Sequence, residues 1–158
     1  MNPINLLSIG IASDHAGFDL KNILVEYLES LGAIVYDFGS HSEKSVDYPD
    51  FAHPLASAVE KGSCDYGIAI CGTGNGINMT VNHHAGVRGA LCWQPEIARL
   101  ARQHNNANIL SLPARFISKY AAIEIVKAFF STDFEGGRHQ DRIDKIKCAS
   151  AAATEVVL

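Results

Sequence analysis

Short apolar runs alternate with helix-like stretches along almost the whole chain, and this alternation restricts the possible folds more than any other feature of the sequence. Runs suited to buried strands cover residues 6–12, 33–38, 66–71, 87–92 and 109–112. Helical patterns cover residues 20–31, 49–61, 77–82, 95–102, 119–130 and 138–153. Strands that alternate with helices pair in parallel and are joined by right-handed crossovers. We therefore predict an α/β fold: a Rossmann-like three-layer α/β/α sandwich with a central five-stranded parallel sheet and an extra C-terminal helix.

The size and charge of the chain limit how that fold is organised and what it binds. With 158 residues and no linker or repeat, we expect a single domain over residues 1–158. A net charge of −4 argues against a broad nucleic-acid-binding surface. No apolar run approaches the roughly 20 residues of a membrane span, and the N-terminus is typical of a first strand, not of a signal peptide. We expect a cytoplasmic protein with no nucleic-acid or membrane partner.

The four cysteines predict free thiols and no metal site. None of Cys64, Cys71, Cys92 and Cys148 forms a CxxC pair or lies near a histidine at zinc-finger spacing. A chain of this size folds without disulfide staples, so we expect a reducing compartment.

Polar and titratable residues follow the predicted strands where an open parallel sheet binds ligands, beyond the carboxyl ends of its strands. Asp14 and His15 follow the first strand, Cys71 ends the third, and Arg115 follows the fifth. The pair Asp14–His15 at a strand-to-helix turn could bind hydroxyls or phosphate. The alternative is a helix N-cap beside a surface histidine.

The strongest local signal is the segment CGTGNG at residues 71–76. Its alternate glycines let backbone N–H groups turn toward an anion, which makes an anion-binding nest. A cysteine at a strand end beside such a nest is expected to have reactive thiolate character. The alternative is a core cysteine followed by a tight turn. The segment lacks the lysine of a P-loop, and GxGxG after the third strand does not match the dinucleotide fingerprint.

Two further sites stay open on local pattern alone. His104–Asn105 lies at the end of a helical pattern, where a histidine is more often a C-terminal cap than a catalyst. Arg138 and Arg142 would share one helix face and could clamp a phosphate, or could form a solvated basic face paired with Asp141 and Asp144. We interpret four other histidines as structural or surface groups: His41, His53, His83 and His84.

Five segments, taken together and in order, resemble the ribose-5-phosphate isomerase B family, which also includes galactose-6-phosphate isomerase subunits. They are DHAGF at 14–18, DYP at 47–49, CGTGNG at 71–76, RQHN at 102–105 and GGRHQDR at 136–142. The resemblance covers nearly everything from residue 7 to residue 147.

This resemblance implies an aldose–ketose isomerase of the pentose phosphate pathway that interconverts ribose 5-phosphate and ribulose 5-phosphate through a cis-enediolate. In the family pattern Cys71 is the base, His104 opens the sugar ring, and Asp14 moves protons among the hydroxyls. The Thr73 hydroxyl and the glycine-loop amides would stabilise the enediolate oxygen. The implied substrate-binding positions are His15, Tyr48, Gly72, Gly74, Asn75, Gly76, Asn105, Arg115, Arg138 and Arg142.

The resemblance also implies that the reaction uses no cofactor and no metal. Family members are dimers or tetramers with a site shared between subunits, so we expect a homodimer or homotetramer whose C-terminal helix lends arginines to a neighbour. Three alternatives stay open: galactose 6-phosphate or another hexose phosphate as the substrate, a non-catalytic sugar-phosphate or nucleotide sensor, and an NAD-dependent dehydrogenase.

Overall fold

A five-stranded parallel sheet forms the centre of the molecule in the computed structural model, which describes residues 3–147. The strands are β1 (Ser8–Ser13), β2 (Ile34–Asp37), β3 (Tyr66–Cys71), β4 (Gly89–Leu91) and β5 (Ile109–Pro113). They lie in the order β2-β1-β3-β5-β4, and each pair of neighbours is parallel. The predicted fold class is confirmed.

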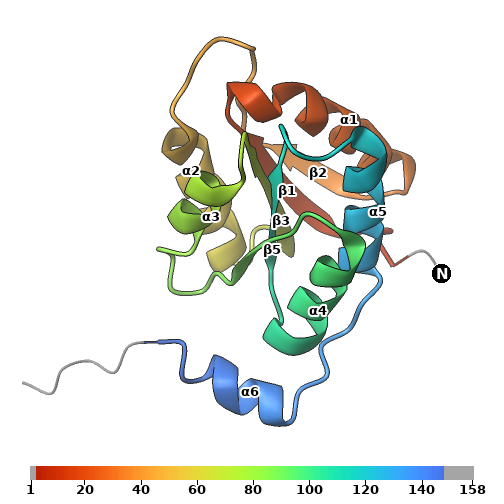
Figure 1. Cartoon of the computed structure of the whole chain (residues 1–158), viewed down its shortest axis with the longest axis vertical. Helices are drawn as coiled ribbons and strands as arrows, with labels where there is room; N and C mark the ends of the chain where they lie inside the picture. The colour runs from red at the N-terminus through yellow and green to blue at the C-terminus, as the bar shows by residue number, and fades with distance from the viewer. Residues whose placement is uncertain (1–2, 148–158) are drawn as a thin grey trace, which may run out of the picture.

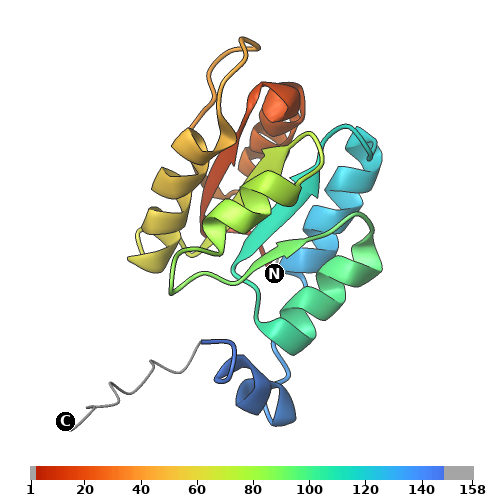
Figure 2. The same ribbon diagram turned by 60° about the vertical axis from the view of Figure 1, so that its left-hand side comes forward.

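Helices cover both faces of the sheet, as Figures 1 and 2 show. They are η1 (His15–Gly17), α1 (Phe18–Ser30), α2 (Tyr48–Glu60), α3 (Asn75–Val81), α4 (Pro95–Asn105), α5 (Lys119–Phe130) and α6 (Arg138–Ile143). One layer contains α1, α4 and α5, and the opposite layer contains α2 and α3. Helix α6 lies beyond the end of α4, outside the three layers (Figure 1). No helix within residues 3–147 is long and apolar enough to cross a membrane.

Side chains of the central strands alternate between the two helical layers, because successive residues of a strand point to opposite faces. In β3, Ile68 and Ile70 pack in the cluster with α1, α4 and α5. Ala69 and Cys71 pack in the cluster with α2 and α3. The strand is therefore buried on both faces, which explains its continuous apolar run.

Glycines let α2 lie close to the sheet. A Cβ added at Gly10 of β1 would lie 2.6 Å from Leu55 Cδ1 of α2, and one at Gly67 of β3 would lie 3.2 Å from the same atom. Larger side chains at these two positions would push α2 outward. This close packing fixes the position of Tyr48, the first residue of α2.

The C-terminal helix is the main error of the sequence prediction. Residues 138–153 were predicted as one helix, but α6 ends at Ile143 with Asp144 as its C-cap. The N–H groups of Lys145 and Ile146 bond to carbonyls three residues back, which tightens the chain into turns after the helix. Residues 148–153 of the predicted helix lie outside the described part of the chain.

Two other element boundaries differ from the sequence prediction. The fourth strand covers only Gly89–Leu91 of the predicted 87–92, and the N–H of Arg88 bonds to the Asn108 side chain 2.7 Å away. Helix α4 continues past Arg102 to Asn105, where Asn106 takes a left-handed conformation (φ +46°) and ends it. The predicted span 119–130 matches α5, and Ser118 caps that helix by accepting a hydrogen bond from the Ala121 N–H.

We predict that Gly10→Ala destabilises the fold by about 1–3 kcal/mol, because its new methyl group overlaps Leu55. Urea denaturation measures the loss. Leu55→Ala removes the overlapping atom, so the double variant should lose less than the sum of the two single losses. Additive losses would contradict the close contact between α2 and β1.

Candidate active site

The carboxyl ends of three adjacent strands bring the first group of predicted site residues together. Cys71 at the end of β3 pairs in register with Pro113 of β5, and Ser13 of β1 pairs with Ile70. Backbone bonds continue past the strand ends: the Asp14 N–H donates to the Ile70 carbonyl at 3.1 Å, and the Arg115 N–H donates to the Gly72 carbonyl at 3.0 Å. Asp14, Cys71 and Arg115 therefore lie at the same edge of the sheet.

Cys71 begins the glycine-rich turn between β3 and α3. Its side chain is 4% exposed and packs beside α2 and α3. Gly74 has a φ of +74°, and an added Cβ there would meet Leu91 at 2.4 Å, so this position requires glycine. Thr73 Oγ1 accepts a hydrogen bond from the Asn75 N–H at 3.2 Å and keeps its own proton to donate. The turn thus presents a hydroxyl and backbone amides beside the thiol.

Two side chains border this turn. The ring of Tyr48 lies so close to Gly76 that an added Cβ would be 2.4 Å from Tyr48 Cζ. The guanidinium of Arg115 lies beside Gly72, where an added Cβ would be 3.5 Å from Arg115 Nη1. A phenol and a cation therefore flank the predicted anion-binding loop.

Asp14 and His15 each hold a backbone segment. Asp14 is 7% exposed, and its Oδ1 accepts from the Gly17 N–H at 3.1 Å, so it caps η1 as one of the two interpretations stated. His15 Nδ1 accepts from the Val46 N–H at 3.2 Å. This bond leaves Nε2 as the protonated nitrogen of a neutral His15. It also ties the loop before α2 to the carboxyl edge.

An ion pair between a buried lysine and an exposed aspartate, which the sequence analysis missed, supports this edge. The side chain of Lys21 in α1 is 1% exposed, and its Nζ contacts Asp37 Oδ2 at the end of β2. Asp37 Oδ1 accepts from the Gly39 N–H at 2.8 Å, and the Gly39 carbonyl accepts from the Ser13 N–H at 2.6 Å. The pair thus anchors the backbone next to Asp14. Lys21 lies one turn before buried Leu24, a spacing that could have revealed it.

The second group of predicted residues lies at the opposite edge of the sheet. Helix α4 runs back to the amino edge, and Asn108, just after its end, accepts a hydrogen bond from the Gly67 N–H at 2.9 Å. Gly67 is near the start of β3, and about 13 Å of strand separates it from Cys71. His104 and Asn105, in the last turn of α4, are therefore remote from Cys71 in the same chain (Figure 1).

The two arginines of α6 belong to this amino-edge group. Arg138 and Arg142 are exposed and lie four residues apart on the helix. Within residues 3–147, no salt bridge joins either of them to Asp141 or Asp144, as the solvated basic face would have required. The geometry therefore leaves both guanidinium groups available for an external anion.

His104 is held by residues to which the sequence analysis gave no role. Its ring stacks on the ring of His139, with centroids 4.3 Å apart and planes inclined by 12°. His139 is 5% exposed, and its Nε2 lies 3.2 Å from Glu135 Oε2, while the Gln103 amide contacts Glu135 Oε1. Because 35 residues separate the two histidines, no periodic pattern could have paired them. The stacking fixes the orientation of His104.

Metal ligation by this cluster does not fit its ring geometry. Of the residues that the structure describes, only His104, Glu135 and His139 offer three ligand atoms within 4.8 Å of one another. An imidazole binds a metal with a lone pair that lies in its ring plane, and two nearly parallel stacked rings direct these lone pairs side by side. One ion cannot lie in both planes without a rearrangement.

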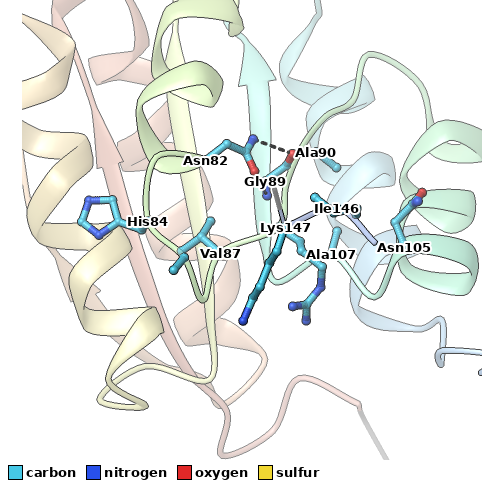
Figure 3. A pocket seen from close by; sticks show the side chains of 11 residues that line it. Asn82, His84, Val87, Gly89, Ala90, Asn105, Ala107, Ile146 and Lys147 are labelled. Carbon is cyan, nitrogen blue, oxygen red and sulfur yellow. Dashed lines mark hydrogen bonds between the residues drawn. The ribbon is translucent and has the colours of Figure 1, made fainter. Parts of the chain in front are cut away.

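A cavity of about 510 Å³ opens next to the amino-edge group (Figure 3). Asn105 lines it together with Arg88 and Lys147, and the loop after α3 forms its other side. Figure 3 shows Asn82 hydrogen-bonded to the backbone of Gly89 at its upper rim, with Ile146 and Lys147 closing the cavity. Of the predicted residues, Asn105 alone lines this cavity.

Comparisons of the chain with known proteins agree on one family of relatives. The family model described as Ribose/Galactose Isomerase matches residues 9–146. The chain is 49% identical over 141 residues to the probable ribose-5-phosphate isomerase B of Mycoplasma genitalium, which covers 88% of this chain and 93% of that protein.

Solved structures agree with that match. Ribose-5-phosphate isomerase B of Clostridium thermocellum superimposes with a TM-score of 0.88 at 46% identity, over 89% of this chain and 95% of that one. The Mycoplasma genitalium enzyme with bound ribulose-5-phosphate superimposes with a TM-score of 0.85 at 49% identity, over 88% and 93% of the two chains.

We predict that Cys92 resists alkylation in the folded protein. Burial raises the pKa of the Cys92 thiol to about 12, so about one thiol in ten thousand is ionised at pH 8. Treatment with iodoacetamide at pH 8 and mass spectrometry of the peptides measures the labelling, with the urea-unfolded chain as the control. Equal labelling of Cys92 in both states would contradict its burial.

Proposed function

We propose that this chain, which belongs to the Ribose/Galactose Isomerase family, interconverts ribose 5-phosphate and ribulose 5-phosphate through a cis-enediolate, with Cys71 as the general base. One observation carries the proposal: a cysteine thiol at the carboxyl edge of the sheet lies beside a glycine-rich turn, with Asp14 and Arg115 at the same edge. The match to the Ribose/Galactose Isomerase family supports assigning this chemistry to the carboxyl edge of the sheet.

The reaction moves one proton between neighbouring carbons. The Cys71 thiolate takes a proton from C2 of the open aldose, which forms the enediolate, and the thiol then returns a proton to C1. A hydroxyl proton moves from the C2 oxygen to the C1 oxygen, and Asp14 provides a carboxylate for that transfer. The turn amides and the Thr73 hydroxyl stabilise the oxyanion, and one such donor contributes about 2.7–4 kcal/mol.

The sugar ring must open before this step, and we assign ring opening to His104. A neutral imidazole can take the ring hydroxyl proton and give a proton to the ring oxygen. Its stacking partner His139 and the adjacent Glu135 keep the ring in one orientation. Arg115, Arg138 and Arg142 supply positive charge for the phosphate, and His15 donates a hydrogen bond to it through Nε2. Tyr48 and Asn105 line the sugar site.

These assignments require two copies of the chain. Cys71 and His104 lie at opposite edges of the sheet, and about 13 Å of strand separates the edges. We infer a homodimer in which the amino-edge group of one copy completes the carboxyl edge of the other. Each site then takes Cys71 and Arg115 from one subunit, and His104, Arg138 and Arg142 from its partner. Tetramers would pair such dimers.

The proposed chemistry also bears on the cofactors, the cellular compartment and the partners of the protein. Electrons move only within the sugar, so the isomerisation needs no redox cofactor and no metal. A catalytic thiol is inactivated by oxidation, so we place the protein in the reducing cytoplasm. We propose that it has no nucleic-acid partner, since the chain carries a net charge of −4.

A five-carbon substrate has the more specific support. A structure 49% identical to this chain holds ribulose-5-phosphate. The matching family also includes galactose in its description, so a hexose phosphate is the second candidate. The ratio of kcat/KM for ribose 5-phosphate and galactose 6-phosphate distinguishes them, and a ratio below one would favour the hexose.

We predict that Cys71→Ala lowers kcat by about 10²–10⁴-fold, the usual contribution of a general base. Formation of ribulose 5-phosphate measures the rate. Cys64→Ala is the matched control, because Cys64 is also a buried thiol in the layer of α2 and α3. A Cys71→Ala protein that keeps its activity would remove Cys71 as the base.

Mixing two inactive variants tests the shared site. Cys71→Ala and His104→Asn chains, unfolded together and refolded, should recover about a quarter of wild-type activity. Half of the dimers are then mixed, and each mixed dimer holds one intact site of two. The variants refolded separately are the controls. A mixture no more active than these controls would show that each site lies within one chain.

A further inference from the structure

Three side chains outside both groups form a linked row on the surface of α2 and the loop after α3. His53 Nδ1 lies 2.9 Å from His84 Nε2, and His84 Nδ1 lies 3.3 Å from Glu60 Oε2. His53 and Glu60 belong to α2, and His84 belongs to the loop between α3 and β4. None of the three has a role in the proposed isomerisation. The contacts between them nevertheless hold two imidazoles and a carboxylate in a fixed sequence.

The contact with Glu60 fixes which ring nitrogen of His84 carries the proton. Glu60 Oε1 accepts from the Gly86 N–H at 2.9 Å. The Gly86 N–H and His84 Nδ1 therefore occupy the two oxygens of the Glu60 carboxylate. A carboxylate only accepts hydrogen bonds, so His84 donates through Nδ1. A neutral His84 therefore presents the lone pair of Nε2 to His53.

We propose that His53 and His84 form a binding site for a divalent transition-metal cation of the Ni²⁺ or Cu²⁺ class. The cation takes the place of the proton between His53 Nδ1 and His84 Nε2, His53 then carries its proton on Nε2, and water fills the other positions of the ion. Nitrogens 2.9 Å apart, each about 2.1 Å from an ion, subtend about 90° at that ion. This angle suits the square-planar or octahedral coordination of Ni²⁺ and Cu²⁺ better than the tetrahedral coordination of Zn²⁺.

The carboxylate behind His84 is a second, independent feature of a metal site. A metal-ligating histidine usually donates its other ring N–H to a carboxylate, which fixes the tautomer and makes the ligand more basic. Glu60 occupies that position relative to His84. The backbone of Gly86 holds Glu60 in turn, so the supporting shell exists before any ion binds.

Ring orientation and access also favour this pair over the stacked pair of the amino edge. The rings of His53 and His84 are tilted by 47° with centroids 5.2 Å apart, so they are not stacked face to face as the rings of His104 and His139 are. His53 is exposed and borders a hollow of about 390 Å³, which is also lined by Tyr48 and Gly76 of the carboxyl-edge group. Water ligands have room there.

Calorimetric titration of the untagged full-length protein with Ni²⁺ tests the site. Ni²⁺ is the probe because it binds imidazole without oxidising the thiols. We expect His53→Ala and His84→Ala each to weaken the binding at least tenfold, while Glu60→Gln weakens it about 10–100-fold by removing the orienting carboxylate. His83→Ala is the matched control, since His83 is an exposed histidine next to His84, and it should bind as the wild type does.

Two outcomes would overturn the proposal. One is a Ni²⁺ affinity of His53→Ala equal to that of the wild type. The other is loss of binding in His139→Ala with binding intact in His84→Ala, which would place the ion at the amino-edge cluster. Wild-type NMR provides a reading that needs no variant: Ni²⁺ should broaden the signals of His53 and His84 first, and broadening centred on His104 would contradict the site. Isomerase activity is not the readout, so either proposal can fail alone.

Discussion

The parallel hydrogen-bond ladders on the two sides of β3 determine where every group of the proposed site lies. Ladders to β1 and β5 hold the ends of three strands in register, about 5 Å apart from one strand to the next. Asp14 follows β1 directly, Cys71 is the last residue of β3, and Arg115 lies two residues after the end of β5. The glycine-rich turn then fits between Tyr48 and Arg115, because α2 packs closely over Gly10 and Gly67. Local changes in the sheet would therefore move all of these groups together.

The same strand direction prevents one chain from completing the site. In a parallel sheet every crossover helix returns the chain to the amino edge, so the C-terminal end of α4 cannot lie near Cys71. Helix α6, which contains both arginines, continues from that edge. Figure 2 shows the helix below the sheet. Assembly with a second copy is the simplest arrangement that would bring the proposed ring-opening imidazole, His104, to the proposed base, Cys71. The exposed Arg138 and Arg142 suit this arrangement, since an arginine that serves a neighbour must project from its own subunit.

How much the sequence revealed depended on whether a feature was local. The β3 span 66–71 and the α5 span 119–130 were predicted correctly, because one is a continuous apolar run and the other begins at the serine cap Ser118. The end of α6 was wrong, since alanines at 149–153 favour a helix whether or not the chain continues one. Three-dimensional pairs were not predictable from spacing. Lys21 with Asp37 and His104 with His139 join residues 16 and 35 positions apart, and only the fold brings them together.

Two histidine pairs in this molecule show why composition alone does not identify a metal site. Each pair lies next to one glutamate, Glu135 or Glu60, and proximity alone would favour the group of Glu135, whose three ligand atoms lie within 4.8 Å of one another. Ring geometry separates them. The stacked rings of His104 and His139 hold their nitrogens side by side, which suits a fixed proton donor and acceptor. The tilted rings of His53 and His84 place two nitrogens 2.9 Å apart with a shared proton between them, and a cation that replaces that proton finds both lone pairs within reach. On this difference in ring angle we assign the proposed ion to the tilted pair and the proposed catalytic imidazole to the stacked pair.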